Sequence, residues 1–189
     1  MGKREQILDA ALALFVERGI QGTATTAISQ QAGVSAGILF HYFKTKDALI
    51  EVLFLETKLT FLTESHAALE NFESMEVQQT AREIWQGVKD WSARHPVEFR
   101  FLQMYYHSPF VSHMPNLPEI EALEARLDHF FTIGIETGVL KPVELTYLRR
   151  ITESMLIGLF HYLQQIPEKH SDEDFIEAAW QMFWDSIRL

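Results

Sequence analysis

The stretch from Thr25 to Lys46, TTAISQQAGVSAGILFHYFKTK, decides the fold of the N-terminal part of this chain. Its pattern predicts a helix-turn-helix, in which two short helices are joined by a tight turn. The first helix would span Ala27–Ala32, with Thr26 as its N-cap because the hydroxyl can accept a bond from a free N–H of the first turn. Gly33 stands in the turn, where a residue that tolerates positive φ is needed.

The second helix of the pair is expected to have two different sides. It would be capped by Ser35 and run from Ala36 to about Phe43, with Leu39 and Phe43 buried. The residues on its outer faces would then be Ala36, Gly37, Phe40, His41 and Lys44. Small residues let the start of such a helix approach a major groove closely, and aromatic or basic residues can reach phosphates and bases. An ordinary helical hairpin of an all-α domain could carry the same turn, so the flanking sequence has to distinguish the two interpretations.

The flanking sequence predicts one helix on each side of this pair. Upstream, apolar residues spaced at i, i+3, i+4, i+7 and i+8 indicate an amphipathic helix over Arg4–Arg18, which Gly19 ends. Downstream, a long helix is expected to begin near Lys46 and to run to about His66. The short helices are therefore braced between a preceding and a following helix.

This arrangement closely resembles the N-terminal domain of the TetR family of transcriptional regulators. The resemblance covers about the first fifty residues and is carried by Ile7–Gly19, Thr25–Thr26, Ala32–Gly37 and Leu39–Leu49. It implies an all-α chain, with a three-helix helix-turn-helix DNA-binding domain at residues 1–46. Residues 47–189 would form a helical ligand-binding and dimerisation domain, although they agree with the family only in length and helical character.

The resemblance, together with the outer-face positions, implies a set of DNA-binding residues. These are Thr25, Thr26, Ser35, Ala36, Gly37, Phe40, His41, Tyr42, Lys44 and Lys46. The two threonines and Lys46 would contact backbone phosphates. Two positions depart from the family pattern. Phe40 stands where tyrosine is usual, which removes one hydroxyl contact to phosphate, and Ser29 stands where alanine is usual and can bond within its own helix.

Composition limits the class of protein. A hydrophobic content of 47% over 189 residues predicts a globular chain with a substantial core, and the absence of cysteine excludes disulfides and thiolate metal sites. The uncharged run Phe101–Pro118 contains three prolines and is not expected to span a membrane. We therefore expect a cytoplasmic protein with no membrane partner.

The net charge of −10 argues against nucleic acid at first sight. However, residues 1–50 hold five Lys or Arg against four Asp or Glu, so the acidic excess lies in the rest of the chain. With so few basic residues at the DNA, we expect modest non-specific binding and a shallow salt dependence.

Beyond residue 66, apolar periodicity predicts further helices and no strand. They would cover Val77–Ala93, Phe99–His107, Glu119–Thr137, Val143–Gln165 and Asp172–Ile187. His95-Pro96 predicts a break, Gly138 the end of a helix, and Ser171 the cap of the last helix.

The last two helices are more apolar than the surface of a monomer. Either they pack in the core, or they pair with their copies in a twofold four-helix interface. The resemblance implies a homodimer, with Gly158 allowing close approach of a second backbone. The interface residues expected on this interpretation are Leu156, Leu159, Phe160, Leu163, Trp180, Phe183 and Trp184.

The middle helices hold more large aromatic residues than a small core needs, and the resemblance implies a small-molecule cavity among them. A mostly apolar cavity would take a hydrophobic or aromatic effector. The candidate residues are Trp85, Phe101, Met104, Tyr105, His107, Phe110, Arg126, His129 and Phe130, with His113 as a further polar group. Ordinary core packing explains any single one of these aromatic residues nearly as well.

No catalytic pattern occurs in the structural context that it needs. There is no Glu-x-x-His, no His-Glu-x-x-His and no glycine-rich phosphate loop. Gly33–Gly37 has the spacing Gly-x-Ser-x-Gly, but a nucleophile elbow needs a strand before the serine, and this segment lies between two predicted helices. We expect neither an enzyme, nor a metal site, nor a cofactor. The sequence predicts a ligand-responsive regulator, a repressor that a small effector releases from a palindromic operator. The alternative is a helical small-molecule-binding or interaction module without DNA binding.

Overall fold

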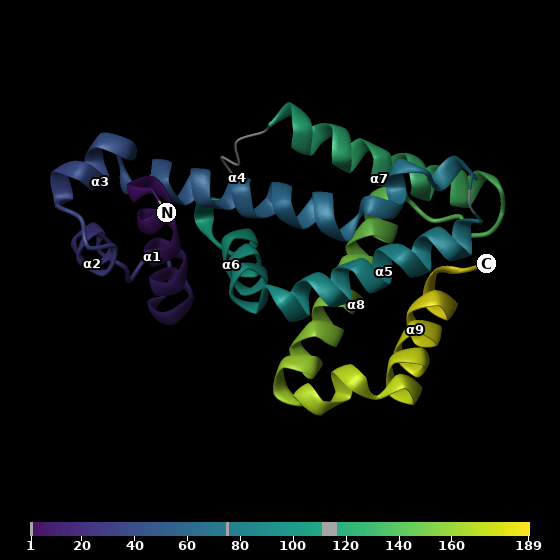
Figure 1. The fold of residues 1–189 in the computed structure, drawn as a ribbon. Helices are drawn as coiled ribbons and strands as arrows, with labels where there is room; N and C mark the ends of the chain where they lie inside the picture. The colour runs from purple at the N-terminus through teal and green to yellow at the C-terminus, as the bar shows by residue number, and fades with distance from the viewer. Residues whose placement is uncertain (1, 75, 111–116) are drawn as a thin grey trace. The chain divides into compact units, whose positions relative to one another are not determined.

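The computed structural model describes residues 2–74, 76–110 and 117–189, and this part of the chain is helical without a named strand. The all-α prediction is therefore confirmed. The α-helices are α1 Lys3–Arg18, α2 Thr25–Gln31, α3 Ala36–Tyr42, α4 Lys46–Ser65, α5 Val77–Arg94, α6 Pro96–Tyr106, α7 Pro118–Glu136, α8 Leu145–Gln165 and α9 Glu173–Ile187 (Figure 1). Short 3-10 helices occupy Ala67–Glu70, Phe72–Ser74 and Pro167–Ser171.

The chain divides into two compact units. Unit 1 is formed by residues 1–60 and 95–117, and unit 2 by residues 61–94 and 118–189. The domain boundary predicted after residue 46 lies inside unit 1, at the start of α4. Helix α4 itself belongs to both units, because its residues up to Thr60 are part of unit 1 and those from Phe61 are part of unit 2.

The core of unit 1 is built on one face of α1. Ile7, Ala11, Leu14 and Phe15 are almost completely buried there, as their helical spacing predicts. Phe101 of α6 stacks on Phe15 with ring centroids 6.1 Å apart. A segment distant in sequence thus supports the helix that precedes the helix-turn-helix.

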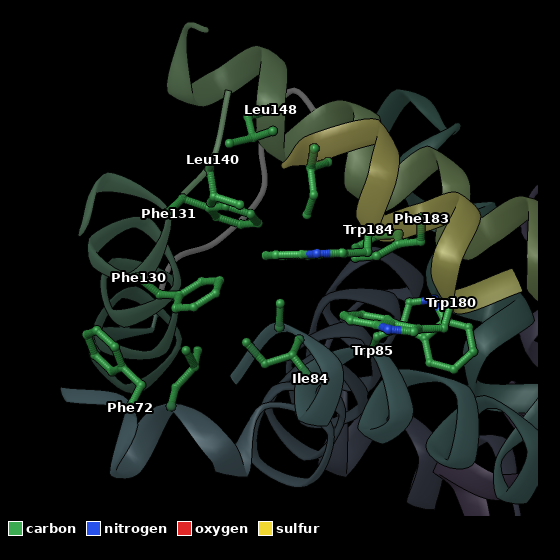
Figure 2. Packing of buried hydrophobic residues seen from close by; sticks show 13 residues of the cluster. Phe72, Ile84, Trp85, Phe130, Phe131, Leu140, Leu148, Trp180, Phe183 and Trp184 are labelled. Carbon is green, nitrogen blue, oxygen red and sulfur yellow. The ribbon is translucent and has the colours of Figure 1, made fainter. Parts of the chain in front are cut away.

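The core of unit 2 is an aromatic cluster from α5, α7, α8 and α9. Figure 2 shows Trp85 of α5, Phe130 and Phe131 of α7, and Trp180 and Trp184 of α9 directed into one interior. The rings of Trp85 and Trp180 meet edge to face at 5.8 Å, and those of Trp180 and Trp184 stack at 5.8 Å. Truncating one such ring to alanine costs about 3–5 kcal/mol of stability, so these residues hold the unit together.

Two of the predicted caps are wrong. Helix α2 begins two residues earlier than predicted, at Thr25, so Thr26 lies inside the first turn and the N-cap is Ala24, which has no side-chain bond to offer. At α9 the cap is Asp172 and not Ser171, because Asp172 accepts a bond from the Phe175 N–H at 3.0 Å. The Ser171 hydroxyl instead donates to the Glu168 carbonyl in the preceding 3-10 helix.

The start and the end of α4 are each fixed by a local contact. At the start, the Ala48 N–H donates to the Thr45 hydroxyl at 3.0 Å, which makes Thr45 the cap. At the end, α5 approaches so closely that a Cβ at Gly87 would lie 2.3 Å from the Ser65 carbonyl oxygen. Only glycine allows this close approach of α5 to the last turn of α4.

Candidate nucleic-acid interface

The turn between α2 and α3 has the geometry that the sequence predicts. Gly33 adopts φ +65°, in the region that favours glycine. The Val34 N–H then turns back to the Ser29 carbonyl at 3.0 Å. Ile28 of α2 and Leu39 of α3 are both completely buried, so the two short helices are held against the rest of unit 1.

Helix α3, labelled in Figure 1, has one exposed face, which is the candidate interface. The helix is capped as predicted, because the Ser35 hydroxyl accepts from the Ile38 N–H at 3.3 Å. Ten residues in and around this helix were predicted to bind DNA, and most of them are exposed. Thr26, Ser35, Ala36, Gly37, Phe40, His41, Tyr42 and Lys44 are exposed, whereas Thr25 and Lys46 are half-buried.

The aromatic residues of this face differ in their surroundings. Phe40 is 42% exposed and Tyr42 is 45% exposed. The Tyr42 ring packs against its neighbours, with its centroid 5.4 Å from that of His41 and 6.4 Å from that of Phe43. Phe43 is buried and anchors the end of α3, as its spacing from Leu39 predicts.

Lys46 has a structural contact in addition to its predicted role. Its ammonium donates to the Gln21 carbonyl at 3.3 Å and lies 6.0 Å from the centre of the Phe15 ring. Partial burial lowers the pKa of Lys46, an effect that the neighbouring Asp47 carboxylate opposes. An ammonium has three protons, so this contact with the loop between α1 and α2 leaves donors for a phosphate.

The Ser29 hydroxyl forms a hydrogen bond within its own helix, as predicted. The side chain is buried at the contact between α2 and its neighbours, and its hydroxyl donates to the Thr26 carbonyl at 3.0 Å. The polar residue therefore leaves no unpaired hydroxyl in this small core.

One link of unit 1 was not indicated by any pattern in the sequence. Arg4 at the start of α1 forms an ion pair with Glu56 of α4, and its guanidinium lies 5.9 Å from the centre of the Phe43 ring. The two charges are 52 residues apart, so only the folded unit brings them together. The Arg4 side chain thus connects α1 and α4 beside the end of α3.

The residues predicted to contact an effector are divided between the two units. Phe101, Met104, Tyr105, His107 and Phe110 belong to unit 1, whereas Trp85, Arg126, His129 and Phe130 belong to unit 2. Trp85, Phe101, Tyr105 and Phe130 are buried, and His107, Arg126 and His129 are exposed. His113 lies outside the described residues.

A cavity of about 180 Å³ opens in unit 2 between the start of α5 and α7. Its walls are formed by Phe72, Glu73, Val77, Thr80, Phe130 and Ile133. Of the predicted effector residues, Phe130 is the one that lines it. Four of these lining residues are apolar, and Glu73 and Thr80 are the polar ones.

His66, directly after α4, is a buried titratable residue that the sequence did not single out. Its Nδ1 lies 2.7 Å from the Ser65 hydroxyl oxygen. That hydroxyl has a single proton and donates it to the Phe61 carbonyl at 2.5 Å. His66 Nδ1 must therefore be the donor in its own bond, which fixes the neutral tautomer. Burial lowers the pKa of His66 to about 4, and the positive charge of Arg149 lowers it further in the same direction.

The expected interface residues of α8 and α9 are mostly internal. Phe160, Leu163, Trp180, Phe183 and Trp184 are buried within a single chain, and Leu156 and Leu159 are half-buried. The three α9 rings belong to the aromatic cluster of unit 2, so core packing accounts for them and they are not free to anchor a partner. The exposed residues of these helices include Ser154, Gly158, Ala178 and Met182, together with Tyr147, Tyr162 and charged residues such as Arg150 and Glu177.

No group of three metal-ligating side chains occurs among the described residues. Within the same ranges, no helix combines the length and the apolar character that a membrane span needs.

Comparisons with known proteins agree with this geometry. Residues 7–53 match the family model of bacterial regulatory proteins, tetR family. The transcriptional repressor KstR2 of Rhodococcus jostii is 38% identical over 50 residues, which are 26% of this chain and 24% of that protein. The transcriptional regulator BetI of Cronobacter sakazakii is 27% identical over 124 residues, which are 66% of this chain and 60% of that protein. The chain thus spans from about a quarter to three fifths of these relatives.

Solved structures extend the likeness to the whole chain. A tetR family transcription regulator from Shewanella sp. PV-4 superposes with a TM-score of 0.89 at 26% identity, covering 100% of both chains. One from Marinobacter aquaeolei VT8 has a TM-score of 0.81 at 23% identity, over 98% of this chain and 95% of that one.

Proposed function

We propose that this chain, which belongs to the TetR family of bacterial regulatory proteins, binds a palindromic DNA operator as a homodimer. It leaves the operator when a small, largely hydrophobic effector binds. The observation that supports DNA binding most strongly is the exposed face of α3. Its buried side fixes the helix through Leu39 and Phe43, while Ala36 and Gly37 leave its start accessible. That combination allows the helix to enter a major groove.

Specificity is proposed to depend on two copies of α3. The interface of one protomer has few cations, since Lys44 and the half-buried Lys46 are the lysines among the proposed contacts. Non-specific attraction to phosphates is therefore weak, and two half-sites about one helical turn apart must be bound together. The exposed sides of α8 and α9 are the surfaces that we propose for the dimer.

The effector is proposed to act in unit 2. The cavity of about 180 Å³, with its phenylalanine and aliphatic walls, supports a small apolar molecule. Helix α4 begins shortly after α3 and continues into unit 2, so it is the covalent route by which binding can affect α3. An effector releases DNA only if it binds the released conformation more tightly than the DNA-bound one. The repressor among the relatives supports repression as the sense of regulation.

The test is affinity capture of sheared genomic DNA from the source bacterium, followed by sequencing. The control is the double variant Gly37→Glu/Lys46→Glu, which places negative charge at the interface. We expect the wild-type protein alone to enrich fragments that share a palindrome. If neither protein enriches DNA, with or without a metabolite extract, the proposal is wrong and the helical binding module without DNA recognition is the better account.

A further inference from the structure

Phe40 is the side chain of the α3 face whose exposure the fold does not explain. Among the described residues, Phe40 is the only phenylalanine that is exposed, and 42% of its surface is accessible to solvent. An exposed aromatic ring forfeits the free energy that burial would give. The ring has no hydrogen-bonding atom, so it gains nothing from water in return. Such a residue on a binding face indicates an apolar partner group.

The immediate surroundings of Phe40 are also apolar and uncovered. Ala36 and Gly37 precede it by four and three residues, and helical side chains lean toward the N-terminus, so the ring lies over these two positions. Both are exposed. A Cβ at Gly37 would meet only the Ser35 hydroxyl oxygen, at 3.8 Å. We call Ala36, Gly37 and Phe40 the apolar tip of α3.

Among the base edges of the major groove, one chemical group is a suitable apolar partner for this tip. The base edges present hydrogen-bond donors and acceptors, and the one apolar group is the C5-methyl of thymine. A ring placed against a polar base edge would remove water from it without replacing the hydrogen bond, which is unfavourable. Against a methyl group, the same ring buries apolar surface on both sides.

We propose that Phe40 is a specificity-determining residue that contacts a thymine methyl group in each half-site. The inference rests on the proposed function, since it requires that α3 enters the major groove. It adds a property of the operator: a thymine stands at the position of each half-site that faces the start of α3.

Tyr42 provides a matched comparison on the same helix. It is as exposed as Phe40, at 45%, but its ring already packs against His41 and Phe43. Its hydroxyl is also able to bond a phosphate. Removing the Tyr42 ring should therefore weaken DNA binding without changing how the protein distinguishes thymine from uracil.

The experiment uses a duplex that the wild-type protein selects from a random library. Single thymines of this duplex are replaced by deoxyuridine, which has the same hydrogen-bonding groups and lacks only the methyl. Affinities are measured for the wild-type protein, Phe40→Ala and Tyr42→Ala, and thermal unfolding shows that the variants are folded. We expect one position per half-site where deoxyuridine weakens wild-type binding about fourfold, and about fifteenfold when both half-sites are changed.

The two variants show whether Phe40 is responsible for the discrimination between thymine and deoxyuridine. For Phe40→Ala the thymine and uracil duplexes should bind equally, whereas Tyr42→Ala should keep the wild-type discrimination at its lower affinity. The inference is overturned if wild-type binding ignores every methyl, or if Phe40→Ala still discriminates at the sensitive position. A selection that recovers no duplex would overturn the proposed function itself, and the inference with it.

Discussion

Gly33 adopts φ +65°, and a Cβ added there would meet no atom within 4 Å. The cost of a Gly33→Ala substitution is therefore backbone strain alone, which we expect to lower the free energy of unfolding by about 1–2 kcal/mol. Gly37→Ala is the matched control, because Gly37 has ordinary helical geometry, and alanine there should stabilise the protein by about 0.5–1 kcal/mol. Urea denaturation of the three proteins measures both changes. Equal destabilisation by the two substitutions would contradict the assigned turn.

His66 makes stability depend on pH. In the unfolded chain its pKa is near 6.5, whereas burial lowers the pKa to about 4 in the folded protein. Between these values the unfolded chain binds a proton that the folded chain does not. Stability therefore increases with pH across this window and is lost on acidification from about pH 6.5 to 4, by roughly 3 kcal/mol.

The measurement is a set of denaturation curves between pH 4 and 7 for the wild-type protein and His66→Asn. Other groups titrate in both proteins, so the difference between the two profiles isolates this histidine. We expect the wild-type profile to fall more steeply toward acid. Parallel profiles would show that His66 is not buried as a neutral side chain.

Helix α4 offers a test at the scale of one element. Its cap is Thr45, which accepts the Ala48 N–H. Thr45→Ala should destabilise the protein by about 1 kcal/mol, and Thr45→Ser should retain most of that stability because serine keeps the accepting hydroxyl. Thermal unfolding monitored by circular dichroism compares the variants. If serine and alanine destabilise equally, the hydroxyl does not cap the helix.

Periodicity in the sequence predicted the helices better than it predicted their ends. The spacing of apolar residues gave the predicted helix near Lys46–His66, which is observed as Lys46–Ser65. Caps depend on one residue of backbone register, which a repeat of 3.6 residues does not determine. Thr26 and Ser171 were therefore assigned wrongly, although Ser35 was correct.

What periodicity does not reveal is the partner of an apolar face. A helix face that packs in its own core and one that packs on a second copy have the same spacing of large residues. Trp180 and Trp184 were assigned to a partner for this reason, yet they pack with Trp85 inside one chain. Periodicity likewise does not predict contacts between segments that are distant in sequence, such as the ion pair between Arg4 and Glu56.

At the scale of the whole molecule, the dimer should depend on the exposed sides of α8 and α9. Met182 is 72% exposed, and a Cβ at Gly158 would meet nothing within 4 Å. We expect Gly158→Arg/Met182→Glu to give a folded monomer, because charge and bulk would be forced between the two protomers. Val97→Glu, on the exposed side of α6, should leave the dimer intact.

Light scattering coupled to gel filtration gives the mass of each variant, and circular dichroism shows whether it is folded. Trp180→Glu should behave differently, since a charge in the aromatic cluster unfolds the chain and does not release a folded monomer. A double variant that remains dimeric would place the interface elsewhere.

The central claim is that α3 binds a specific DNA sequence, and titration of fluorescent duplexes tests it most directly. The two duplexes are the captured palindrome and a scrambled version of the same composition, and the proteins are the wild type and Gly37→Glu. We predict that the wild-type protein binds the palindrome at least about a thousandfold more tightly than the scrambled duplex. Gly37→Glu should lose this preference while it stays folded, with a thermal unfolding temperature no lower than that of the wild type. Equal wild-type affinity for both duplexes, or a preference that survives Gly37→Glu, would contradict the account.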